Sequence, residues 1–424
     1  MRIESDTAAI EKNLFFLADT IKSHGGWVDE DLTIYSLDGA MRIIKEGFRN
    51  PLKPLIALPE DLMLPTDRLG LSVKNDQIDL SPDNGLSDIQ IKLAETMIEI
   101  YNQTDKIKNH RDECCWTFYK DDPAPLESLV KARTINPSLQ EQLDFTLGAS
   151  ETSEEEFLCN SYFNTRTIGH KQVNKDDEEL VTTKDIMPIV DFLNHHPAGS
   201  MFSFGKNDNT DIDIKADRSL VVLDTRPQAD SNECFVFYNQ MDSVDTFLKY
   251  GFPDHNSPYI RSVPLEVELD GIGTIQIQSL FGVGVKILKK SMAALKPYIP
   301  SVISKTDDRL ELSHVMIPTN NIVPNALRRS LRLVLSNWSA SNGKQLKPQQ
   351  VWEAIIEIEK RVIDENQKFY NNLKNEMAKS NQNEQVNRVA HLAELQATKL
   401  YKYNFDVSHY SGATQLEEAN NAAE

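Results

Sequence analysis

The chain has 424 residues, 40% of them hydrophobic, which is long enough for two or three domains with apolar cores. Its formal net charge of −19 argues against a nucleic-acid-binding protein, which needs cationic surface to neutralise phosphates. The same charge suits a basic protein partner, or serves only solubility.

Four cysteines without a Cys-x-x-Cys pair argue against a disulfide framework and against a structural zinc cluster. No stretch has the length and apolarity of a bilayer-spanning helix, and the first residues lack the apolar core of a signal peptide. We therefore expect an intracellular monomer, cytoplasmic or nuclear, that binds no membrane.

The N-terminal part predicts one helix followed by short strands. The apolar face of the helix consists of Ile10, Leu14, Leu17 and Ile21. Ser5 and Asp6 are the predicted capping residues, and Gly25-Gly26 ends the pattern. Strand-like apolar runs follow at residues 32–35, 41–44 and 55–58.

The rest of the chain alternates between helical and strand-like patterns. Residues 87–156 are predicted helical, with Ser87 near the start of one helix and three glutamates at 154–156 in the first turn of another. Strand signals return at residues 186–252. Towards the C-terminus, apolar residues at helical spacing predict two helices separated by the polar run 379–384. The residues expected in the core are Val351, Ile355, Ile358 and Val362 in the first helix, and Val386, Val389, Ala393 and Leu400 in the second.

One motif carries most of the functional information. Residues 188–197 read Pro-Ile-Val-Asp-Phe-Leu-Asn-His-His-Pro, and the strand-like run 235–238 ends in Tyr238. Residues 250–252 then read Tyr-Gly-Phe. An Asn-His pair alone means little, but this order of elements resembles the SET-domain methyltransferases of the Rubisco large-subunit methyltransferase class.

The resemblance implies an α+β fold in which a SET-type β domain is split by a helical insert and followed by an all-α C-terminal domain. The expected segments are 1–65 for the N-terminal helix and first part of the SET core, and 66–185 for the insert. Residues 186–260 would hold the second part of the core, with the cofactor and active site, and 261–424 a mainly helical substrate-binding domain. The implied reaction is S-adenosyl-L-methionine-dependent methylation of a lysine side chain in a basic protein substrate.

The resemblance also assigns roles to single residues. Tyr238 is the catalytic tyrosine, and the cofactor contacts are Arg166, Asn194, His195, Phe252 and Gly39. The substrate contacts are Tyr250 and Phe192. Tyr238, Tyr250 and Phe252 each have the alternative of an ordinary core position, and Arg166 has that of a surface arginine. No metal is expected, because the His195-His196 pair has no evident third ligand.

The sequence departs from the family at the turn that usually reads Gly-x-Gly. Here residues 39–41 read Gly-Ala-Met, and Ala and Met resist backbone angles that Gly tolerates. Two alternatives therefore stay open. One is a protein-histidine methyltransferase of the same fold, against which Tyr250 argues; the other is a protein-binding adaptor in which the SET core has lost catalysis.

Overall fold

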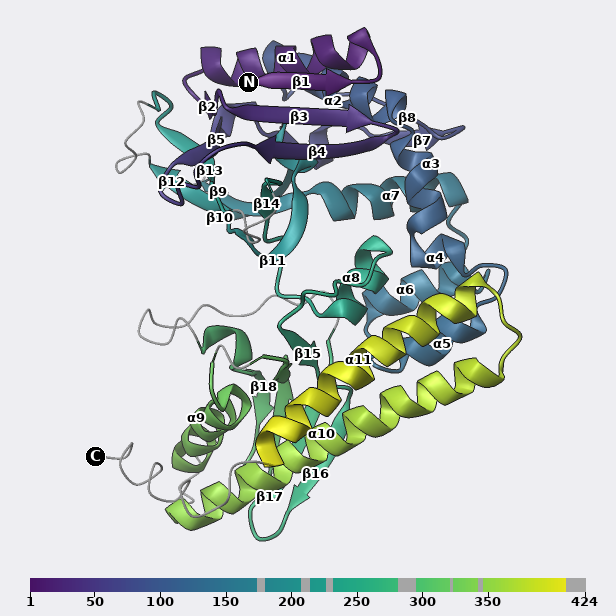
Figure 1. Cartoon of the computed structure of the whole chain (residues 1–424), viewed down its shortest axis with the longest axis vertical. Helices are drawn as coiled ribbons and strands as arrows, with labels where there is room; N and C mark the ends of the chain where they lie inside the picture. Colours follow the sequence, from purple (N-terminus) through teal and green to yellow (C-terminus); the bar gives the residue numbers. More distant parts are fainter. Residues whose placement is uncertain are drawn as a thin grey trace. The chain divides into compact units, whose positions relative to one another are not determined.

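The computed structural model of the chain describes residues 1–173, 180–206, 214–225, 232–280, 295–320, 323–341 and 346–408. The architecture is mixed α+β, with helices and several small sheets (Figure 1). Two compact units form. The first comprises Met1–Cys114 and Glu151–Asn239, and the second comprises Cys115–Ser150 and Gln240–Glu424.

The first unit is built on small sheets. Its strands are β1 (Arg2–Ser5), β2 (Trp27–Val28), β3 (Leu32–Leu37), β4 (Ala40–Lys45), β5 (Pro54–Pro59), β6 (Leu64–Pro65), β7 (Ser72–Lys74), β8 (Gln77–Asp79), β9 (Ile168–Val173), β10 (Leu180–Ile186), β11 (Asn194–Ser200), β12 (Ser203–Lys206), β13 (Arg218–Leu223) and β14 (Phe235–Val236). They pair in the orders β1-β3-β4, β12-β13-β5-β2, β6-β10-β9, β11-β14 and β7-β8. Its helices are α1 (Ala8–Ser23), α2 (Asp88–Gln103), α3 (Lys106–Glu113) and α7 (Glu154–Arg166), with short 3-10 turns η1 (Glu60–Leu62), η2 (Thr66–Arg68) and η3 (Val190–Phe192).

The first two helices follow the apolar spacing of the sequence. The four predicted core residues of α1 are all buried. The cap differs from the prediction: the Thr7 hydroxyl, not Ser5 or Asp6, accepts a hydrogen bond from the Ile10 N–H at 3.2 Å. Helix α2 begins after Ser87 as predicted, in a capping box with Gln90.

The segment expected as a helical insert is more mixed than its apolar pattern suggested. Besides α2, α3 and α7 it contains β7, β8 and β9, and its central part, residues 115–150, belongs to the second unit. That part forms α4 (Cys115–Phe118), α5 (Ala124–Val130) and α6 (Pro137–Thr146). The strands are short and polar, so they leave little periodic signal.

The second unit combines a sheet with long helices. Its other elements are α8 (Ser243–Tyr250), β15 (Tyr259–Arg261), β16 (Leu265–Leu269), β17 (Gly273–Gln278), η5 (Lys296–Tyr298), β18 (Ser301–Lys305), β19 (Arg309–Ser313), β20 (Met316–Pro318), α9 (Ala326–Ser341), α10 (Pro348–Lys379) and α11 (Glu384–Ser408). The sheet order is β16-β17-β19-β18. Helices α10 and α11 lie side by side (Figure 1), and all predicted stripe residues except the half-buried Val351 are buried.

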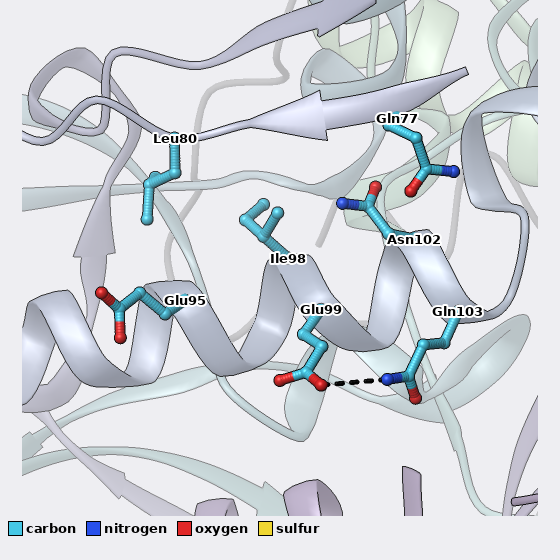
Figure 2. Close-up of a pocket in the computed structure, with 7 residues that line it drawn as sticks. All are labelled: Gln77, Leu80, Glu95, Ile98, Glu99, Asn102 and Gln103. Carbon is cyan, nitrogen blue, oxygen red and sulfur yellow. Dashed lines mark hydrogen bonds between the residues drawn. The ribbon is translucent and has the colours of Figure 1, made fainter. Parts of the chain in front are cut away.

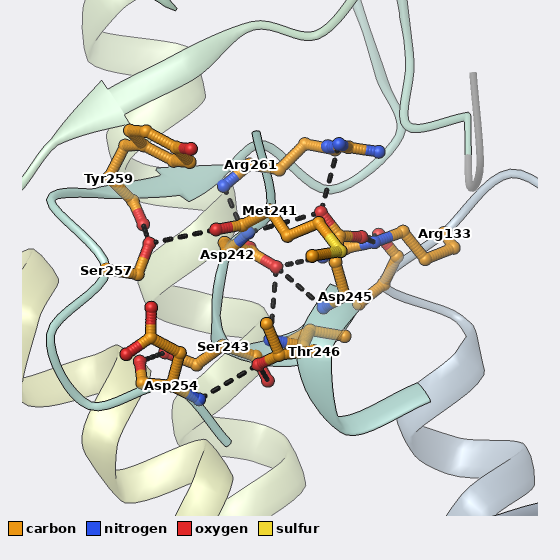
Figure 3. A network of polar contacts seen from close by, with 12 residues as sticks. Arg133, Met241, Asp242, Ser243, Asp245, Thr246, Asp254, Ser257, Tyr259 and Arg261 are labelled. Atoms are coloured by element: carbon orange, nitrogen blue, oxygen red, sulfur yellow. Dashed lines mark hydrogen bonds and ion pairs between the residues drawn. The ribbon is translucent and has the colours of Figure 1, made fainter. Parts of the chain in front are cut away.

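Helix α8 interrupts the region where strand signals were predicted. Asp242 caps it by accepting from the N–H groups of Val244 and Asp245, and Gly251 ends it in the left-handed conformation at φ 82°. Figure 3 shows the buried ionic network at its start, where Arg133 contacts both aspartates and Arg261 contacts Asp245. The helix is therefore held at its first turn, and Tyr250 is its last residue.

Candidate functional site

The candidate site in the first unit is organised by two strands from distant parts of the sequence. Strand β11 pairs in parallel with β14, so Asn194 lies opposite Phe235 and His195 opposite Val236. The residues before β14 run along β4, where the Cys234 N–H donates to the Ile43 carbonyl at 2.8 Å. Three segments thus meet at one place, and β4 lies more than a hundred residues before the other two.

Asn194 joins these three segments through its side chain. Its Nδ2 group donates to the Met41 carbonyl of β4 at 3.3 Å and to the Glu233 carboxylate at 2.8 Å. The side chain is exposed, although both of its bonds reach other strands. Asn194 therefore fixes the register of β11 against β4 and the segment before β14.

His195 and Tyr238 lie against each other. The Tyr238 backbone N–H donates to His195 Nδ1 at 3.2 Å, which makes that nitrogen an unprotonated acceptor. The two rings are 5.1 Å apart, and the Tyr238 hydroxyl donates to the Leu193 carbonyl at 2.8 Å. The structure thus brings Tyr238 beside the Asn-His pair, as the resemblance implies.

Arg166 is the last residue of α7 and lies beside Asp191. Its Nη1 is 3.4 Å from the Asp191 carbonyl oxygen and 3.9 Å from a carboxylate oxygen. The guanidinium also lies over the ring of Tyr162, with 5.4 Å between its central carbon and the ring centroid. Its Nε is buried and has no hydrogen-bond partner among the described residues.

Burial shifts the pKa values of the groups around Arg166. Burial raises the pKa of Asp191 to about 6, although Arg166 and the Tyr101 hydroxyl, which donates to its carboxylate at 2.7 Å, both oppose this. Burial also raises the pKa of Tyr238 to about 12, with Asp191 adding to the shift and Arg166 opposing it. Tyr238 is therefore neutral at physiological pH and acts as a hydrogen-bond donor rather than as a base.

The backbone just before Asp191 is strained. Ile189 has φ 66° and ψ −44°, and the Val190 N–H donates to the Pro188 carbonyl at 2.8 Å. This is a γ-turn of the rare type, and it is unfavourable for a β-branched residue. Such strain concentrates at functional sites, so it marks the segment independently of the motif.

Phe192 and Gly39 occupy different surroundings. Phe192 is buried and packs edge-on against Tyr101, so it belongs to the core of the first unit, and its role as a substrate contact stays a prediction. Gly39 forms the turn between β3 and β4 together with Asp38, both with positive φ. This Asp-Gly hairpin needs one glycine, which gives a structural reason for the departure at residues 40 and 41.

Tyr250 and Phe252 belong to the second unit. Their rings are 6.0 Å apart, the Lys249 ammonium lies 5.4 Å from the centre of the Tyr250 ring, and Phe252 is 42% exposed. Their assigned roles as substrate and cofactor contacts stay predictions.

Sequence reasoning quoted Asp191 without a role and missed Tyr101 and Lys106 altogether. Tyr101 lies in the region 87–156 that was predicted helical, and Lys106 follows α2 where no motif marks it. Their positions against Arg166 come from tertiary structure. The Asp191 carboxyl in the middle of an apolar run was the one signal that could have found this cluster.

A separate hollow of ≈ 470 Å³ lies between β8 and α2. Figure 2 shows its lining: Gln77, Leu80, Glu95, Ile98, Glu99, Asn102 and Gln103. It contains none of the predicted site residues, and the Asn102 amide is occupied by two hydrogen bonds to the backbone of Ile78. Across the described residues, no group of three or more His, Cys, Asp or Glu side chains could hold a metal ion. No described helix is both long and apolar enough to cross a membrane.

Comparisons with known proteins find similar solved structures, but no family model and no curated protein matches the chain. Among solved structures, one similar structure is the SET domain of LSMT bound to lysine and AdoHcy, with 11% sequence identity, 93% of this chain and 90% of the other covered, and a TM-score of 0.39. Another is Rubisco LSMT bound to AdoMet, with 12% identity, 94% of this chain and 91% of the other covered, and a TM-score of 0.37. At these scores the similarity does not establish a family.

Proposed function

We propose that the chain is an S-adenosylmethionine-dependent methyltransferase whose target is a lysine side chain of a protein. The observation that carries the proposal is the position of Tyr238. Its hydroxyl is fixed on the Leu193 carbonyl, directly before the Asn194-His195 pair, by the parallel pairing of β11 with β14. This is the arrangement that the sequence motif leads one to expect of a SET-type site.

The chain's own residues fit the cofactor. Arg166 offers a planar cation whose buried Nε has no partner among the described residues, which suits the carboxylate of the cofactor's amino-acid part. Asn194 and His195 would hold the same molecule from β11, and the Gly39 turn would border it. When bound, S-adenosylmethionine supplies a methyl group on a positively charged sulfur.

The protein's part in the reaction is placement and desolvation. A lysine amine has a pKa of about 10.4, so presenting it neutral at pH 7 costs about 4.6 kcal/mol unless its surroundings lower that pKa. Tyr238 is protonated at pH 7 with or without the burial that raises its pKa to about 12, so it orients groups instead of removing the amine's proton. The rate should therefore rise towards alkaline pH.

The test is transfer of a labelled methyl group from S-adenosylmethionine into proteins of a lysate from the host. We expect a labelled protein that contains methyl-lysine by mass spectrometry. Tyr238→Phe should lower turnover by at least about tenfold with little change in cofactor affinity, because the hydroxyl acts mainly on the reacting groups. Tyr401→Phe, at a side chain that is 68% exposed, is the matched control.

Two outcomes would redirect the proposal. Methyl-histidine in the labelled protein would favour the alternative specificity. Cofactor binding and label transfer that are both absent would leave a protein-binding adaptor as the better description.

A further inference from the structure

Lys106 connects the β3–β4 turn to the cluster around Arg166. Its ammonium donates to the Gly39 carbonyl at 2.7 Å, across 67 positions of sequence. Within the described part of the chain this is its only hydrogen bond, so two of its three N–H donors are left for another acceptor. Lys106 thus bonds one predicted cofactor contact, Gly39, and lies within electrostatic reach of another, Arg166.

The position of Lys106 is unfavourable for a cation in three ways. The side chain is partly buried, it is the first residue of α3, and Arg166 is close enough to repel it. A cation at a helix N-terminus opposes the helix dipole, and like charges in a desolvated place repel strongly. One hydrogen bond to a carbonyl does not offset these costs, so Lys106 is not placed here to stabilise the fold. Residues that lower stability in this way often serve a function.

Lys106 has charged neighbours but no ion pair in the part of the chain that the structure describes. Lys106 and Arg166 are both cations, and the carboxylate with the largest electrostatic effect on Lys106, that of Asp191, is shared between Arg166 and the Tyr101 hydroxyl. The other anion that acts on Lys106 is Glu113, at the far end of α3. The two carboxylates equal the two cations in number, but neither forms an ion pair with Lys106 among the described residues, so its ammonium has no direct anionic partner. Such a site favours a bound anion.

We propose that Lys106 is a second cation which, together with Arg166, binds the carboxylate of the cofactor's amino-acid part. The inference rests on the proposed function and adds a residue to it. Lys106 would compensate for the single glycine of the β3–β4 turn, because its bond to the Gly39 carbonyl holds that turn beside the carboxylate. Lys106 therefore acts both on the ligand and on the turn.

The test compares two ligands that differ only in the carboxylate. Binding of S-adenosylmethionine and of decarboxylated S-adenosylmethionine is measured by calorimetry on wild type, Lys106→Met and Lys106→Gln. Both variants should lose about tenfold in affinity for the complete cofactor, since a charge-assisted hydrogen bond is removed, and less than about twofold for the decarboxylated one. Lys108→Met, on the exposed face of α3, should behave as wild type.

The pH dependence gives a second measurement. Burial, with Arg166 adding to it, lowers the pKa of Lys106 to about 8, while Asp191 and Glu113 oppose the shift. Wild-type affinity for the complete cofactor should therefore fall between pH 7 and pH 8.5, and the affinity of Lys106→Gln should not follow it.

Each result decides the proposal. Equal losses for both ligands, or no loss for either, would overturn it. Wild-type affinity in Lys106→Gln would overturn it too, because the hydrogen bond alone would then suffice. If wild type binds neither ligand, the proposed function fails first and the role of Lys106 falls with it. Thermal unfolding of both variants checks that the loss is not a folding defect.

Discussion

Asp191 has a buried carboxyl group between the Tyr101 hydroxyl and Arg166, and burial raises its pKa to about 6. In the unfolded chain an aspartate has a pKa of about 3.9. Between these values the folded protein binds more protons than the unfolded one. The stability that the protonated Asp191 carboxyl group contributes is therefore fully present below about pH 4 and is lost as pH rises through about 6.

This gives a prediction for Asp191→Asn, which keeps an oxygen for the Tyr101 hydroxyl but no longer titrates. Between pH 4.5 and pH 7.5 the wild type should lose about 2 kcal/mol more free energy of unfolding than the variant does. Urea denaturation at the two pH values measures the difference. Parallel pH dependence in the two proteins would contradict the raised pKa.

At the scale of elements, apolar periodicity predicted well wherever one face is buried over several turns. The apolar stripes predicted for α1, α10 and α11 all correspond to helices, and the polar run 379–384 corresponds to the connection between the last two. Helix α8 was missed because it has only eight residues and because three of its six buried residues, Ser243, Asp245 and Thr246, are polar, so its burial does not follow an apolar pattern.

The buried network at the start of α8 predicts that two arginine substitutions in the second unit differ in how much they lower the free energy of unfolding. Arg133→Met removes a fully buried partner of Asp242 and Asp245 and should cost about 3–5 kcal/mol, because it leaves buried charge without compensation. Arg309→Met breaks an ion pair with Glu266 in which both side chains are nearly half exposed, and should cost under about 1 kcal/mol. Chemical denaturation of both variants measures these costs, and similar costs would contradict the structural role of the network.

At the scale of the whole molecule, the sequence indicated the class of fold but not the division into units. Residues 115–150 join a unit whose remaining chain starts more than 80 positions later, and no composition change marks the transfer. The parallel pairing of β11 with β14 was accessible only through the family resemblance, since no local pattern encodes a contact between Asn194 and a segment some 40 residues away. The strained turn at Ile189 has no sequence signal at all.

The central claim is that the first unit holds S-adenosylmethionine through Arg166 and the Asn194-His195 pair. Calorimetric titration with S-adenosylhomocysteine, the demethylated product, tests it most directly, since it needs no protein substrate. We predict a micromolar Kd for wild type, at least about tenfold weaker binding for Arg166→Gln, and wild-type binding for Arg218→Gln at a half-exposed arginine of the same unit. No heat up to about 1 mM ligand, or equal binding by Arg166→Gln, would contradict the claim.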